Sequence, residues 1–542
     1  MRGFSYSAKF GLRWLVSLAC LSCLLSFEVS SSTLHRGNSA EPASLDPHQG
    51  QDVADLTIVS DMFEGLVAFD GDGELVPGVA ISWESSLDGK QYRFHLAPNL
   101  SWSDGVALTA DDFVYSLRRA LAPANASPTA YHLYPILNAP EINNGQRQIQ
   151  ELGVRALDKT TLLIELSAPT PYLPAILALA VAMPIPRHVV EMYGKSWTKP
   201  GHIVSNGAYK LVDWLPSEYI EVVRNSHFRL ASEVAIEQVR YYPLEDGVAA
   251  LNRFRAGMLD IGHGVPFSKL GWMRENLPAA LRLSPGLTTE YLAINVTHSN
   301  LSDPRVRRAL SLAIDREKIV GKLRRTGERA AYGFVPPGMP GYGQNSQLDF
   351  VEMPMEQRLV EARRLMAEAG YSPDKPLPVT LRFFAGKASK KIAIVLAAMW
   401  KPIGVKTALM SSDSRVLVAD MLNQDYDIVL TNWGADFADA SNFIDLHHSR
   451  SESNFPGYSN PDYDDFVRAA SLEADPVRRN QLLHRAEALL MKDQPVIPIF
   501  YMTSKWMVGA DVIGWKDNAL DLHPSRNLRL SREPAYSPGQ GG

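Results

Sequence analysis

Cysteine is nearly absent from this chain of 542 residues. The two cysteines present, Cys20 and Cys23, both lie close to the amino terminus. Because no thiol follows them, the rest of the chain forms neither an internal disulfide nor a thiolate metal site, and it carries no cysteine nucleophile. These absences exclude cysteine-dependent enzymes and small domains stabilised by disulfides.

An excess of basic residues is also lacking, since 54 lysines and arginines face 59 aspartates and glutamates and the net charge is −5. A nucleic-acid-binding surface needs a concentration of positive charge, so we expect no nucleic-acid partner. The hydrophobic share of 46% and the charged share of 21% are typical of a globular chain. At about 150 residues per domain, the length predicts several domains.

The common motifs of catalysis are missing as well, because the sequence has no GxSxG elbow, no HExxH pair and no complete phosphate-binding loop. Asp70 to Glu74 imitates the start of a calcium loop, but Ile81 stands where the final glutamate is needed. The side chains of the adjacent His447 and His448 point apart in any regular element. We therefore expect no enzymatic activity, no metal and no cofactor.

The amino-terminal segment has the parts of a secretory signal peptide. Residues 1–14 carry three basic residues and no acidic one, and the apolar run at 15–27 is shorter than the roughly 20 residues that a spanning helix needs. Small residues follow, so we expect a signal peptide at 1–31, cleavage near Ser31 and export to the periplasm. An uncleaved anchor and a lipoprotein attached at Cys20 or Cys23 are the alternatives. The lipoprotein is less favoured because neither cysteine has an aliphatic residue three places upstream.

The first part of the chain predicts hairpins and strands. A turn at Asp70–Gly73 separates two short apolar runs, and residues 92–96 alternate apolar and polar side chains with the period of a strand. Proline clusters at 169–186 and 336–340 exclude regular helix there and are candidate domain boundaries.

Helical and strand patterns alternate in the second half. Asp303 and Pro304 form a helix start, an N-cap residue followed by the proline that the first helical position tolerates. Apolar residues at helical spacing predict further helices over residues 359–369 and 482–490. Strands are predicted at 378–384, 426–430 and 496–501. This alternation indicates α/β layers.

A series of short motifs covers the chain from about residue 37 to residue 530. They are Ala40–His48, Phe63–Val67, Pro77–Glu84, Trp102–Gly105, Leu108–Tyr115, Val204–Tyr209, Asp303–Asp315 and Glu368–Tyr371. In this order and at this spacing the motifs resemble the bacterial extracellular solute-binding proteins of the peptide-binding family. The similarity is greatest to the periplasmic oligopeptide-binding proteins of ABC importers.

The resemblance implies an α/β fold, the two-lobed periplasmic-binding-protein fold of class II type, with an extra third domain and a two-segment hinge. The ligand is then enclosed between the lobes. After the signal peptide at 1–31, the implied division is lobe I at 32–67, 188–287 and 504–542, domain II at 68–187 and lobe III at 288–503.

The resemblance also implies a function, that of the substrate-binding component of an ABC peptide importer. Such a protein captures short peptides mainly by main-chain hydrogen bonds and a carboxylate–ammonium pair. The expected partners are short peptides and the permease and ATPase subunits in the inner membrane, and a monomer is expected. The alternative is the same scaffold with a non-standard ligand, such as a cell-wall peptide, an opine, a metal chelate or a signalling peptide.

Asp436 is the residue that we expect to bind the α-ammonium group of the peptide. It falls in Asn432–Phe437, which resembles the segment that carries the ammonium-binding aspartate in the oligopeptide-binding proteins. A charge taken into a closed cleft needs an opposite charge, because burying it alone costs several kcal/mol. Four further residues are implied beside the ligand main chain: Asn432, Trp433, Gly434 and Ala435. A solvated strand-end aspartate and a core tryptophan are the structural alternatives.

The resemblance alone assigns further positions to the cleft. They are Asp55 as a lining acid, and His132, His263 and Tyr291 as ligand-facing rings.

The chain also departs from its relatives at the far end of the ligand site. Relatives hold the carboxylate of short peptides with basic or histidine side chains where this chain has Ser389, Met421 and Leu430, so we expect an altered length preference. A cysteine pair that staples the cleft in some relatives is replaced by Thr288 and Gly434. Redox conditions should therefore leave binding unchanged.

Overall fold

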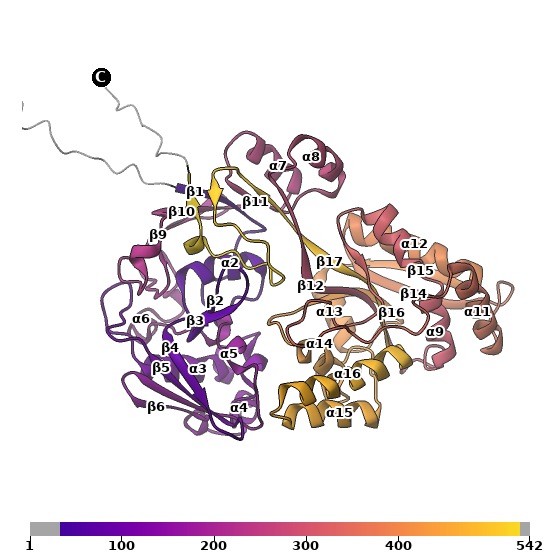
Figure 1. The fold of residues 1–542 in the computed structure, drawn as a ribbon, viewed down its shortest axis with the longest axis horizontal. Coiled ribbons are helices and arrows are strands. Elements are labelled where there is room, and N and C mark those ends of the chain that lie inside the picture. Colours follow the sequence, from indigo (N-terminus) through magenta and orange to yellow (C-terminus); the bar gives the residue numbers. More distant parts are fainter. Residues whose placement is uncertain (1–32, 532–542) are drawn as a thin grey trace, which may run out of the picture.

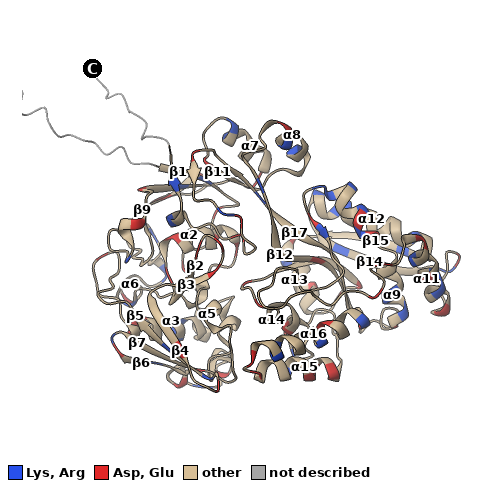
Figure 2. Cartoon of the chain, viewed as in Figure 1, with Lys and Arg blue, Asp and Glu red and all other residues tan. Residues whose placement is uncertain are grey.

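The computed structural model describes residues 33–531, which form two bodies joined by a pair of long strands (Figure 1). The expected signal peptide, both cysteines and the carboxyl-terminal tail lie outside the described residues. In the part of the chain that is described, no helix combines the length and apolar character that a membrane span requires. Figure 2 shows basic and acidic residues interspersed over both bodies.

A single sheet of eleven strands runs through both bodies. Its lobe I end contains a parallel pair, β1 with β10, extended by the antiparallel strands β9 and β8 on one side and by β11 on the other. The bounds are β1 (Thr33–Asn38), β8 (Tyr209–Leu215), β9 (Tyr219–Arg224), β10 (Gln238–Pro243) and β11 (Ile261–His263), with α2 (Val53–Met62), α7 (Gly247–Arg255) and α8 (Leu270–Asn276) in the same lobe.

The lobe III end of the sheet places β14 between β15 and β16, both parallel to it. The strands are β13 (Arg329–Ala330), β14 (Leu377–Phe384), β15 (Val405–Ser412) and β16 (Ile428–Gly434). The helices are α9 (Pro304–Leu312), α10 (Arg316–Lys318), α11 (Met355–Glu368), α12 (Lys387–Trp400), α13 (Ser414–Leu422), α14 (Ser441–Ile444), α15 (Pro461–Leu472) and α16 (Pro476–Asp493). The Asp303 side chain caps α9 by accepting a hydrogen bond from the Arg305 N–H. The three helices predicted in this half of the chain are confirmed.

Domain II has its own antiparallel sheet in the order β4-β5-β7-β6. The predicted hairpin around Asp70–Gly73 is confirmed as the pair β2–β3. The strands are β2 (Val67–Phe69), β3 (Leu75–Pro77), β4 (Ala80–Ser85), β5 (Gln91–Leu96), β6 (Val154–Asp158) and β7 (Thr161–Glu165), and the helices are α3 (Ala110–Leu121), α4 (Ala139–Asn143), α5 (Leu173–Ile176) and α6 (Arg187–Tyr193). Buried side chains of domain II and lobe I form one continuous core, and lobe III has another.

Two strands, β12 (Leu281–Ile294) and β17 (Val496–Val508), join the lobes and pair with each other along most of their length (Figure 1). Their ladder is interrupted between Pro285 and Thr289. The interruption lies at the predicted lobe boundary, where Leu287 donates its N–H to the Ala519 carbonyl of lobe I and accepts from the Ala435 N–H of lobe III. The predicted fold, two α/β lobes with a third domain and a two-segment hinge, is confirmed.

Some predicted boundaries are wrong. The strand predicted at 426–430 begins at Ile428 and continues to Gly434, because β12 offers it a partner as far as Thr288. The strand predicted at 496–501 continues to Val508 for the same reason. The proline cluster at 169–186 does contain a short helix, α5, which tolerates Pro174 because its missing N–H falls in the first turn. The chain also adds two-residue strands β18 (Val512–Ile513) and β19 (Arg529–Leu530).

Candidate ligand-binding site

Asp436 lies directly beyond the carboxyl end of β16 and lines a cavity between the lobes. The hydrogen bond from Ala435 to Leu287 fixes the preceding residue against β12, and the Asp436 N–H points to the Asn442 side-chain oxygen at 3.4 Å. The Asp436 side chain retains 37% of its exposure. Its carboxylate therefore remains reachable by a ligand in the cavity.

His132 of domain II is the residue that approaches this carboxylate from the opposite side. Its Nε2 lies 3.6 Å from Asp436 Oδ2, across the gap between domain II and lobe III. Burial lowers the pKa of His132, and Asp436 partly opposes that shift. Burial likewise raises the pKa of Asp436, against the influence of His132. Within residues 33–531, Asp436 forms no ion pair with a lysine or arginine, so its charge is left for another cation.

The cavity that contains Asp436, called here the Asp436 cavity, has a volume of about 290 Å³. Its walls come from α2, from residues 178–183 of domain II, from the end of β16 and from residues 520–526. Two arginines of lobe I, Arg36 and Arg526, also line it. Arg36 donates to the His523 carbonyl and to Ser525 Oγ, and Arg526 donates to the Phe69 carbonyl. Neither arginine has a carboxylate partner in the described part of the chain.

A second cavity, called here the aromatic cavity, has a volume of about 440 Å³. Rings from domain II and lobe III form its walls: Tyr131, His132, Tyr134, Tyr172, Trp433 and Phe437. Tyr172 of domain II stacks on Phe437 of lobe III with centroids 5.3 Å apart. Because His132 lines this cavity and its partner Asp436 lines the other, the two cavities meet at this pair.

The segment predicted beside the ligand lies at this junction. Trp433 lines the aromatic cavity and donates from Nε1 to Asn442 Oδ1 at 3.0 Å, so it is a cavity wall and not a fully buried core residue. Ala435 lines the Asp436 cavity. Asn432 and Gly434 are exposed at the end of β16. Thus Asp436, Trp433, Ala435 and His132 are brought together.

Three other predicted residues are not brought to either cavity. Asp55 is buried, and its carboxylate accepts hydrogen bonds from the Ala43 and Gln51 N–H groups, so it secures the loop before α2. Tyr291 is buried in the lobe III core with its ring edge-to-face on another aromatic ring. His263 packs edge-to-face on Trp506 at 4.7 Å, behind a residue that does line the Asp436 cavity.

The three positions that the resemblance assigns to the far end of the ligand site are not among the residues that line either cavity. Met421 and Leu430 are buried in the lobe III core, where a cation would be desolvated, and Ser389 lies on α12. The arginines that do reach the Asp436 cavity, Arg36 and Arg526, come from opposite ends of the chain, and sequence reasoning missed both. Thr288 and Gly434, which the resemblance places where some relatives have a cysteine pair, lie directly opposite each other on β12 and β16.

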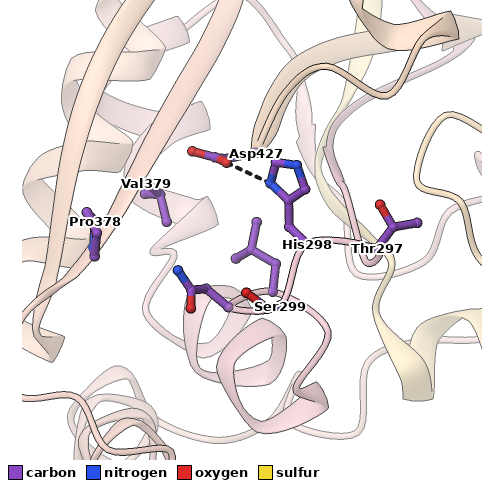
Figure 3. A pocket seen from close by; sticks show the side chains of 8 residues that line it. Thr297, His298, Ser299, Pro378, Val379 and Asp427 are labelled. Carbon is purple, nitrogen blue, oxygen red and sulfur yellow. Dashed lines mark hydrogen bonds and ion pairs between the residues drawn. The ribbon is translucent and has the colours of Figure 1, made fainter.

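A further cavity of about 350 Å³ lies at the other end of the lobe III strands (Figure 3). His298 Nδ1 is 2.9 Å from Asp427 Oδ1 there, and Asp427 also accepts the Thr380 N–H. Asp427 immediately precedes β16, whereas Asp436 follows it, so this cavity is separate from the junction between the lobes. No set of three or more metal-ligating side chains is found among the described residues.

The fold and the site together define a two-lobed protein with a ligand cavity between its lobes. The chain matches the family of bacterial extracellular solute-binding proteins, family 5, over residues 74–455, and it belongs to that family. The resemblance stated from the motifs is confirmed. Members of this family are binding proteins.

Particular relatives cover nearly the whole chain. The periplasmic oligopeptide-binding protein OppA of Escherichia coli strain K12 is 36% identical over 92% of this chain and 92% of its own. The probable deoxycholate-binding periplasmic protein YgiS of the same strain is 35% identical over 90% of this chain and 93% of its own. Among solved structures, Haemophilus influenzae OppA in complex with the peptide RPPGFSPFR is 32% identical, with a TM-score of 0.82 over 93% of this chain and 99% of that chain.

Proposed function

We propose that this protein is the substrate-binding component of an ABC importer and that it captures short peptides between lobe I and lobe III. The observation that carries the proposal is the Asp436 carboxylate, which lines the cavity between the lobes. Its ionisable neighbour is His132, whose lowered pKa favours the neutral form of the ring. A peptide α-ammonium group supplies the cation that this site lacks.

The charge of the site favours a peptide over an anionic ligand. A steroid acid such as deoxycholate brings a carboxylate for Arg36 and Arg526 but no ammonium group, so it would leave Asp436 enclosed without a cation. A zwitterionic peptide matches Asp436 with its amino end and finds Arg36 and Arg526 in the same cavity for its carboxylate. The sequence similarity to the oligopeptide-binding protein OppA also favours a peptide as the ligand.

Main-chain recognition is the second part of the proposal. Asn432 and Gly434 are exposed where β16 ends beside Asp436. An extended peptide that adds along this strand end binds through groups that every peptide shares, so side-chain tolerance follows. Trp433 then provides an apolar wall beside the first residues.

The remaining expectations follow from this role. The protein works in the periplasm as a monomer, binds its ligand without chemical turnover, and delivers the closed form to the permease and ATPase subunits in the inner membrane. Lobe I at 32–67, 188–287 and 504–542, domain II at 68–187 and lobe III at 288–503 stay our proposed division, with the hinge at the β12 interruption.

The test is calorimetry of the full chain with peptides of two to eight residues, with deoxycholate and a cell-wall peptide as separate arms. We expect binding of free-amino peptides and none of deoxycholate. Mass spectrometry of the ligand that co-purifies with the protein identifies the natural class. Silence across the peptide panel together with deoxycholate binding would overturn the proposal. A cell-wall peptide as the only ligand would replace short peptides in general by that narrower class.

A further inference from the structure

We propose that the aromatic cavity is a specificity pocket for a cationic side chain on the first residue of the peptide, with Asp445 as its charge partner. This inference rests on the proposed function and adds a substrate preference to it. The pocket lies next to the ammonium site, because His132 and Trp433 in its wall adjoin Asp436. The side chain nearest to a bound α-ammonium group is that of the first residue.

Asp445 is an acid without a matching cation. Its side chain lines the aromatic cavity, and within residues 33–531 it forms no ion pair or side-chain hydrogen bond. The nearby guanidinium of Arg479 is committed elsewhere, since it makes two hydrogen bonds of 2.8 Å to the Asp439 carboxylate. Two acids therefore share one arginine, and Asp445 carries the unbalanced charge.

The other charges of the cavity do not cancel Asp445. Arg450 and Glu452 both line the cavity and both are exposed, so they offset each other at the rim. Poor hydration raises the pKa of Asp445 to about 7, an effect that Arg479 opposes and Asp439 reinforces. A bound ammonium or guanidinium group would reverse that shift by favouring the ionised form.

The aromatic walls of the cavity, in addition to Asp445, favour a bound cation. Trp433 presents its aromatic ring to this space, whereas the Tyr172 ring is already stacked on Phe437 at 5.3 Å and lies 4.9 Å from the Arg479 guanidinium. Aromatic faces attract ammonium and guanidinium groups most strongly where water is excluded. The volume of about 440 Å³ lies within the range of about 300–1,000 Å³ typical of ligand pockets. A lysine or arginine side chain is therefore the kind of group that fits.

The test compares three peptides that differ only at the first residue: Lys-Ala-Ala, norleucine-Ala-Ala and Glu-Ala-Ala. Norleucine keeps the length of the lysine side chain without its charge. We expect the wild-type protein to bind the lysine peptide about 10- to 100-fold more tightly than the norleucine peptide, the range of one charge-assisted hydrogen bond. The glutamate peptide should bind more weakly than either. Ala-Lys-Ala should show little of this preference.

The variant Asp445→Asn should remove the preference by weakening the lysine peptide while leaving the norleucine peptide unchanged. Asp374→Asn, an exposed acid in the turn before β14, is the matched control and should retain the preference. Equal affinity of wild-type protein for the lysine and norleucine peptides would overturn this inference while leaving the proposed function intact. Absence of binding for all peptides would instead contradict the proposed function. The wild-type comparison decides the matter even if Asp445→Asn does not fold.

Discussion

Asp436 Oδ2 and His132 Nε2 lie 3.6 Å apart although they belong to lobe III and domain II. The same interface holds the stacked pair Tyr172 and Phe437. The acid that we propose as the ligand anchor is therefore itself part of a contact between domain II and lobe III. A cation bound at Asp436 strengthens one face of that contact, which links occupancy to closure.

Replacing Asp436 by asparagine, which has the same shape but no charge, tests whether this residue binds the α-ammonium group. Asp436→Asn should weaken binding of peptides with a free amino terminus by about 2–5 kcal/mol, because the α-ammonium group is then enclosed without an opposite charge. N-acetylated peptides should lose much less. Calorimetry with each peptide pair measures the difference, and Asp425→Asn, an exposed acid before β16, is the control. Equal losses for free and acetylated peptides would remove Asp436 from its proposed role.

The affinity for free-amino peptides should depend on pH through the same residue. Burial raises the pKa of Asp436 above its ordinary value of 3.8, so this carboxylate takes up a proton at a higher pH than an exposed aspartate. Only the ionised form attracts ammonium, and affinity should fall as pH decreases through that raised pKa while staying nearly constant above it. Titration calorimetry from neutral to acidic pH, with Asp436→Asn as reference, measures the effect. If the affinities of Asp436→Asn and of the wild-type protein change with pH in parallel, this prediction is contradicted.

The carboxylate of the peptide should depend on an arginine from the other lobe. Arg526 lines the Asp436 cavity and has no acidic partner among the described residues, so Arg526→Gln should cost peptides with a free carboxyl terminus about 1.5–3 kcal/mol. Amidated peptides lack that charge and should bind both proteins alike. Arg529→Gln, exposed on β19, is the control. If the amidated peptide loses as much affinity, Arg526 acts through the fold and not through the ligand.

How far the sequence predicts this site depends on the distance between its parts. Asp436 and Trp433 could be predicted together because they share one short segment whose strand pattern and motif are visible together, and each lines a cavity. Tyr291 was assigned to the cleft from the resemblance alone, and the structure buries its side chain in the lobe III core, which a strand pattern does not reveal. Arg36 and Arg526 escaped notice because their proximity depends on the two ends of the chain meeting in lobe I, where Arg36 donates to the His523 carbonyl.

Asp55 illustrates the same limit in another way. The resemblance assigned it to the cleft, but its carboxylate already accepts hydrogen bonds from backbone N–H groups of the preceding loop. Local patterns fared better: the Asp303 cap, the turn at Asp70–Gly73 and the helix over 359–369 depend on neighbours within a few residues, and all three are confirmed.

The pair Thr288 and Gly434 offers a test of the lobe III strand pairing. These residues are directly opposite, and a Cβ atom at position 434 would lie 2.9 Å from Thr288 Oγ1. The double variant with Thr288→Cys and Gly434→Cys should form a disulfide on oxidation and raise the unfolding free energy by about 2–4 kcal/mol. Thiol titration and denaturation with and without reductant measure this, and Thr288→Cys alone is the control. Two free thiols under oxidising conditions would show that the register is different.

The interruption of the β12–β17 ladder should affect the rates of ligand association and dissociation. The Leu287 backbone is hydrogen-bonded to both lobes, so we expect the lobes to rotate about this point of the two-segment hinge and not to slide past each other. Ligand binding and ligand release then require the same rotation of the lobes in opposite directions. A substitution that restricts the backbone of residues 286–288 should slow ligand association and ligand dissociation in similar proportion. The dissociation constant, which is the ratio of these two rates, should then change little.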